Sequence, residues 1–92
     1  MSPEILKIYN IIDYIKLFIS NDVVIPNIKQ FDYFNYENLI DVISNGLTNS
    51  TYKNNIISID DYEIIVDNIE DTYYEITIIK NIDLYEPKGP SK

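Results

Sequence analysis

Isoleucine supplies 20 of the 92 residues, and the spacing of these isoleucines changes along the chain. In the first twenty residues they recur every three or four positions, which is the period of one face of an α-helix. From about residue 52 onward, β-branched and aromatic residues alternate with polar ones, as in half-buried strands. A chain of this length has room for one domain, so we expect helix and sheet to share a single core.

The first helix is predicted to begin just after Ser2, with Ser2 as the N-cap and Pro3 in the first turn. Its isoleucine stripe covers barely two heptads, which is short for a coiled coil, so we favour a helix packed on a sheet. Ser20 to Asp22 should end it. Leu6 and Leu17 fall on the opposite side of the helix and are candidates for contact with a second subunit.

The segment 22–35 is predicted to be irregular, with Val23 to Ile25 as a short extended piece before Pro26. Four aromatic residues then crowd into positions 31–36. They either form a binding patch or, as we favour, close one end of the core. A second, shorter helix follows, with Asn35 as its cap and Gly46 as its C-terminal stop, and 48–51 is a polar connector.

Three strands are predicted over 55–59, 62–69 and 73–82, joined as an antiparallel meander. A two-residue turn at 60–61 and a three-residue turn at 70–72 place Ile59 beside Tyr62 and Val66 opposite Ile76. This register gives one apolar face, because a slip of one residue would turn every side chain over. Its members are Ile57, Ile59, Tyr62, Ile64, Val66, Tyr74, Ile76 and Ile78. Neither turn contains glycine, the residue that hairpins prefer.

The predicted fold is therefore α+β: a long N-terminal helix and a shorter second helix packed on a three-stranded antiparallel β-meander. We expect residues 1–86 to form this single domain. Residues 87–92, which contain two prolines and a glycine, are expected to be a flexible polar tail.

Charge narrows the choice of partner. The chain has seven lysines, no arginine and fifteen acidic residues, for a net charge of −8. Binding to nucleic acid or to anionic membranes depends on basic side chains, so we expect neither. Residues 56–87 alone hold nine acids and one base, Lys80. Opposite potential speeds association, so a basic protein is the favoured partner.

The second face of the meander mixes carboxylates with apolar side chains, which is more typical of an interface than of a plain solvent face. Asp67 is expected opposite Glu75, a like-charge pair that lowers stability. The alternative is that these acids only keep the sheet soluble. The face should carry Ile56, Ser58, Glu63, Ile65, Asp67, Ile69, Tyr73, Glu75, Thr77 and Ile79.

Catalysis is not expected. The chain has no cysteine and no histidine, which removes thiol nucleophiles, imidazole acid–base chemistry and the usual zinc ligands. Carboxylate pairs can hydrolyse glycosides, but they need a deep cleft. Residues 67–71 lack the spacing and the glycine of a calcium loop, so we expect neither metal nor cofactor. Without a signal-like N-terminus or a membrane-length apolar run, the expected location is the cytoplasm.

The short acidic chain, rich in tyrosine and aspartate and lacking a catalytic set, resembles immunity proteins of bacterial toxins and phage or viral inhibitors of host nucleases, including anti-CRISPR and DNA-mimic proteins. This resemblance implies an inhibitor that blocks a basic partner such as a nuclease or a nucleic-acid-binding effector. The predicted contact residues are Glu63, Ile65, Asp67, Glu70, Asp71, Tyr73 and Glu75, with Tyr74 adding apolar contact. The alternative is a self-associating structural or accessory viral protein, a homodimer burying Leu6, Leu17, Ile65 and Ile79.

Overall fold

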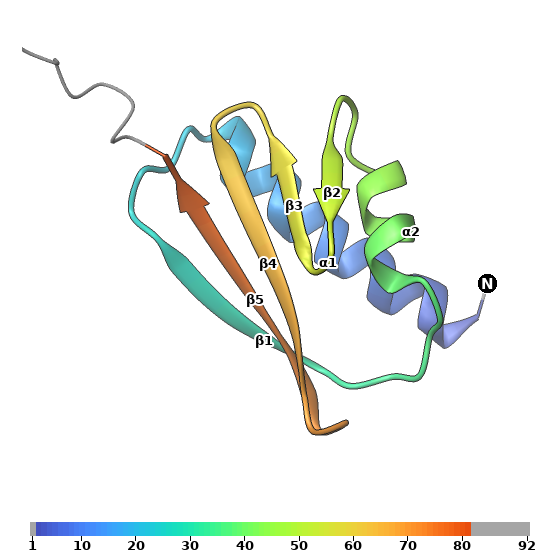
Figure 1. Ribbon diagram of the computed structural model, residues 1–92. Coiled ribbons are helices and arrows are strands. Elements are labelled where there is room, and N and C mark those ends of the chain that lie inside the picture. Colours follow the sequence, from blue (N-terminus) through green and yellow to red (C-terminus); the bar gives the residue numbers. More distant parts are fainter. Residues whose placement is uncertain (1, 82–92) are drawn as a thin grey trace, which may run out of the picture.

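Five strands form one antiparallel sheet, and two helices accompany it in the computed structural model, which describes residues 2–81. Along the chain these are α1 (Pro3–Ser20), β1 (Asn27–Asp32), α2 (Leu39–Asn45), β2 (Thr51–Lys53), β3 (Ile56–Ile59), β4 (Tyr62–Ile69) and β5 (Tyr73–Lys80). The strand order is β1-β5-β4-β3-β2, and α1 crosses behind the sheet (Figure 1). The α+β class is therefore confirmed. The expected tail, 87–92, lies outside the described residues, as does Ile82 at the expected end of the last strand.

Helix α1 begins as its sequence predicts. The Ser2 side chain accepts a hydrogen bond from the backbone N–H of Ile5 at 3.3 Å, which satisfies one of the free donors of the first turn. Ile8, Ile11 and Ile15 lie on the side of the helix that faces the sheet and are fully buried. The helix ends at Ser20, and Asp22 follows in the left-handed region at φ 53°.

Helix α2 begins later than predicted, at Leu39, so Asn35 does not cap it. Asn38 takes the N-cap position instead, in a left-handed conformation and without a side-chain capping bond. Gly46 ends the helix at φ −81°, so the reason for glycine is not a left-handed turn. A Cβ atom here would lie 2.6 Å from Cδ1 of Ile12, which shows that the end of α2 approaches α1 closely.

The expectation of three strands is wrong in number, because the meander β3-β4-β5 carries an additional strand on each side. β1 lies in the segment predicted to be irregular and pairs with β5 over its whole length. β2 pairs with β3 around a turn at Asn54 and Asn55. β1 and the three-residue β2 bury few side chains, so backbone pairing rather than an apolar pattern holds them in place.

The register of the meander is as predicted. Ile59 pairs with Tyr62, and Val66 pairs with Ile76. Aspartate and glutamate take the positions where glycine was missing, since Asp60, Glu70 and Asp71 all adopt positive φ between 51° and 56°. Aspartate tolerates this region better than most residues, which helps the chain to make these tight turns without glycine, whereas Glu70 has no such advantage.

All eight residues assigned to the apolar face of the meander are buried, none with more than 9% of its surface exposed. They share one core cluster with the buried residues of both helices, so both helices pack on the same side of the sheet. The aromatic segment closes one end of this core: the Phe34 ring packs edge-on against Tyr74, and the Tyr74 hydroxyl donates to the Phe34 carbonyl at 2.7 Å.

Among residues 2–81, no helix combines the length and apolarity needed to cross a membrane.

Candidate protein-binding face

The side of the sheet that faces away from both helices is called the open face. Because side chains alternate along a strand, its members follow from the observed register. No helix of the described part of the chain packs on it. The open face consists of Ile28, Gln30, Asp32, Thr51, Lys53, Ile56, Ser58, Glu63, Ile65, Asp67, Ile69, Tyr73, Glu75, Thr77 and Ile79.

The carboxylates of the open face come mainly from the two central strands. Asp67 of β4 lies directly opposite Glu75 of β5, as the sequence predicts. Glu63 stands on β4 four residues before Asp67. The side chain of Asn55 donates a hydrogen bond to Asp67 at 2.7 Å, which fixes one of these carboxylates in place. The sequence analysis missed this Asn55 contact, because it placed Asn55 at the start of a strand and did not foresee the β2–β3 turn, for which Asn54 and Asn55 were the available signal.

Five of the seven predicted contact residues lie together on the open face: Glu63, Ile65, Asp67, Tyr73 and Glu75. Each is half-buried by its neighbours on the sheet. Ile56 and Ser58 on β3 extend the face on one side, as the sequence analysis predicted, and residues of the unforeseen β1 extend it on the other.

The other two predicted contacts, Glu70 and Asp71, lie elsewhere. Both are exposed in the β4–β5 turn, where Asp71 exchanges hydrogen bonds with Asn68 across the loop. Tyr74 is a clear correction. It was expected to add apolar contact, but it points into the core with 5% of its surface exposed, because successive strand residues face opposite ways.

The candidates for self-association are divided between the two sides of the molecule. Leu6 and Leu17 are 52% and 62% exposed on α1, which packs behind the sheet. Ile65 and Ile79 belong to the open face. A single two-fold interface uses one patch of each subunit, so it cannot bury both sets.

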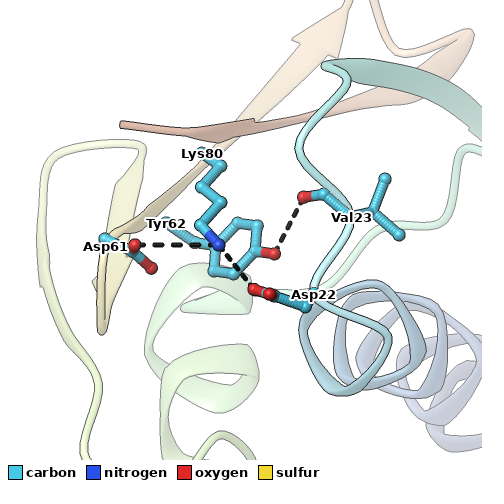
Figure 2. A network of polar contacts seen from close by, with 5 residues as sticks. All are labelled: Asp22, Val23, Asp61, Tyr62 and Lys80. Carbon is cyan, nitrogen blue, oxygen red and sulfur yellow. Dashed lines mark hydrogen bonds and ion pairs between the residues drawn. The ribbon is translucent and has the colours of Figure 1, made fainter. Parts of the chain in front are cut away.

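Lys80, the one base of the meander segment, does not offset the acids of the open face. It pairs with Tyr62 on the covered side, and its ammonium contacts Asp22 at 2.5 Å and Asp61 at 3.9 Å (Figure 2). The hydrogen bond to Asp22 raises the pKa of the Lys80 ammonium above its ordinary value. The Tyr62 hydroxyl donates to the Val23 carbonyl at 2.8 Å, so the network ties the loop after α1 to the end of the sheet.

Other lysines also lie on the covered side. The Lys29 ammonium is 5.8 Å from the Tyr14 ring centroid, and that of Lys7 is 5.7 Å from the Phe34 ring centroid. Among the described residues, Lys53 at the β2 margin is the one base on the open face, against four acids. The covered side also carries acids, including Glu4, Asp13 and Asp41 on the helices, so an excess of carboxylates is not unique to the open face.

Two hollows are found on the described part of the chain, one of them bordered by Asp32 at the edge of the open face. One of about 280 Å³ is lined by Lys16, Ile19, Ser20, Leu47, Thr48 and Ile59, and one of about 220 Å³ by Lys7, Asn10, Phe31 and Asp32. Neither of these two hollows is lined by Glu63, Asp67 or Glu75. Residues 2–81 contain no cluster of three or more side chains suited to holding a metal ion.

Comparison with models of protein families, with curated proteins and with solved structures finds no match to this chain. The functional interpretation therefore depends on the surface itself.

Proposed function

We propose that this protein is a small acidic inhibitor that uses the open face to bind a basic partner and block its nucleic-acid or substrate site. One observation carries the proposal: carboxylates and isoleucines are interleaved on a sheet face that neither helix covers. A face kept only for solubility would need neither the exposed isoleucines nor the like-charge pair of Asp67 and Glu75.

The mechanism follows from the two kinds of side chain on the face. Glu63, Asp67 and Glu75 stand in for the phosphates that a nucleic-acid-binding surface recognises, and their field speeds the encounter with a basic protein. Ile65 and Tyr73 then exclude water from the contact, which strengthens each ion pair formed there. No catalytic step and no cofactor is involved.

The partner class is a nuclease or another nucleic-acid-binding effector, as for immunity, anti-CRISPR or DNA-mimic proteins. We propose that the protein acts in the cytoplasm, because a sequence without cysteine is typical of a reducing compartment.

The test compares two variants that each remove three negative charges. The face variant carries Glu63→Gln, Asp67→Asn and Glu75→Gln, which keep side-chain shape. The control variant carries the same kind of change in α1 and in the loop before α2: Glu4→Gln, Asp13→Asn and Glu37→Gln. Tagged wild-type protein and both variants are used to capture partners from lysate at low and high salt, and captured proteins are then tested pure for inhibition.

Wild type and the control variant should capture the same basic protein and inhibit its activity, whereas the face variant should lose both. High salt should weaken capture because exposed charge pairs are screened. Equal capture by the face variant would show that the open face is not the interface. Circular dichroism of each variant checks that the fold is intact.

Self-association, the second candidate function, is favoured by a different observation. Leu6, Tyr9 and Leu17 are 49–62% exposed along α1. Light scattering at increasing concentration separates the two functions. A dimer that Leu17→Gln dissociates, with no basic protein captured, would favour self-association through α1. A monomer throughout would exclude it.

A further inference from the structure

Three isoleucines and one threonine of the open face form a line across the strands. The observed pairing places Ile28 of β1 beside Thr77 of β5, Thr77 beside Ile65 of β4, and Ile65 beside Ile56 of β3. We call these four residues the isoleucine row. Ile28 and Ile56, at its two ends, are 60% and 38% exposed. Three strand-to-strand steps of about 4.8 Å make the row about 14 Å long.

Carboxylates border the isoleucine row on both sides. Asp67 and Glu75 lie two residues along their strands in one direction, and Glu63 lies two residues along β4 in the other. Two residues of a strand cover about 6.7 Å, so Glu63 on one side of the row is about 13 Å from Asp67 on the other. An α-helix with its side chains is about 10–12 Å wide. The strip between the carboxylates therefore matches the width of one helix.

We infer that the partner segment bound by the open face is a basic amphipathic α-helix lying along the isoleucine row. This inference rests on the proposed function and adds the shape of the ligand to it. A helix covers the row with about ten residues, and apolar side chains at i, i+4 and i+7 contact the isoleucines. Lysines or arginines on both flanks of that stripe reach the carboxylates on either side, since their long stems lie along apolar surface.

Two other occupants fit the face less well. A second copy of this chain would bring Glu63, Asp67 and Glu75 against the same acids, which repel one another. An extended strand presents only every second side chain to the sheet, in a single line, and has no flanking residues to reach Glu63 on one side and Asp67 and Glu75 on the other. An amphipathic helix can carry basic side chains on both sides of its apolar stripe, so it matches the carboxylates on both sides of the row.

The test uses three fluorescent peptides of identical leucine and lysine composition, each about 14 residues or four helical turns long. One has leucines at helical spacing, one alternates leucine and lysine as a strand would, and one is scrambled. Fluorescence anisotropy measures their affinity for wild type, for the charge variants defined above, and for Ile65→Gln. Leu17→Gln, on α1, is the matched control for loss of one exposed apolar side chain. Ile28→Gln at the sheet edge is a second row variant in case Ile65→Gln disturbs folding.

The helical peptide should bind about tenfold more tightly than the other two. Ile65→Gln and Ile28→Gln should each remove most of that advantage, whereas Leu17→Gln should leave it unchanged. Equal binding of all three peptides, lost in the face variant alone, would overturn the helix inference and leave the proposed function standing. Binding that the face variant and the control variant retain equally would overturn both.

Discussion

The hydroxyl of Tyr74 provides a test of which way the strand β5 faces. It donates to the Phe34 carbonyl at 2.7 Å in a region where Tyr74 and Phe34 are 5% and 6% exposed. Tyr74→Phe removes the donor and leaves that carbonyl unsatisfied and shielded from water. The expected loss is about 1–3 kcal/mol of unfolding free energy.

Tyr73 is a matched control for the same chemical change. It is the neighbouring residue, lies on the open face, and its hydroxyl makes no hydrogen bond to another described residue. Tyr73→Phe should change the free energy of unfolding by less than about 0.5 kcal/mol.

Urea unfolding followed by circular dichroism measures both variants. With an m-value of about 1 kcal/mol per molar for a small domain, Tyr74→Phe should lower the midpoint by about 1 M or more. Equal losses, or a larger loss for Tyr73→Phe, would refute the assignment of faces. The open face would then not be the surface described above.

Two further predictions concern the core and the tyrosines. Gly46→Ala should lower stability by about 1–3 kcal/mol, because its Cβ would overlap Cδ1 of Ile12, and Ile12→Val in the same chain should recover part of the loss in urea unfolding. Burial raises the pKa of Tyr62 and of Tyr74, so the unfolded chain releases these protons first as pH rises. The hydrogen bond to Asp22 likewise raises the pKa of Lys80. The free energy of unfolding should therefore stay constant up to about pH 10 and fall at higher pH. A urea midpoint that rises between pH 9 and pH 11 would contradict this prediction.

The meander could be predicted from sequence because two independent features agree. Alternation of isoleucine with polar residues defines two faces, and the lengths of the two turns fix which residues are opposite each other. A turn at 70–71 shortened to two residues would put Val66 and Ile76 on opposite faces, and the structure has the three-residue alternative, in which they pair. The face that carries the candidate site follows from the same register.

The two flanking strands could not be found in this way. The residues of β1 alternate as Asn27, Lys29 and Phe31 on one side and Ile28, Gln30 and Asp32 on the other, so neither side is apolar. An edge strand like this is specified by pairing with β5, which joins residues more than forty positions apart. β2 is only three residues long. The two asparagines that follow it were a usable signal, because asparagine tolerates the positive φ that Asn54 adopts.

The candidate site was predicted in part for the same physical reason. Strand residues such as Glu63 and Glu75 were placed correctly because alternation assigns them to a face. The turn acids Glu70 and Asp71 were grouped with them on charge alone, although a turn at the end of a sheet belongs to neither face. The contribution of Ile28 to the isoleucine row depended on β1, which was not foreseen.

Isoleucine methyl NMR tests the central claim most directly, because isoleucines stand on both sides of the sheet. The protein is labelled at isoleucine methyl groups and titrated with the helical leucine–lysine peptide. Methyl signals of Ile28, Ile56 and Ile65 should shift. Those of Ile57 and Ile76, which are buried on the covered side of the same sheet, should stay in place. Shifts confined to isoleucines of α1, or no change at the isoleucine row under saturating peptide, would contradict a binding role for the open face.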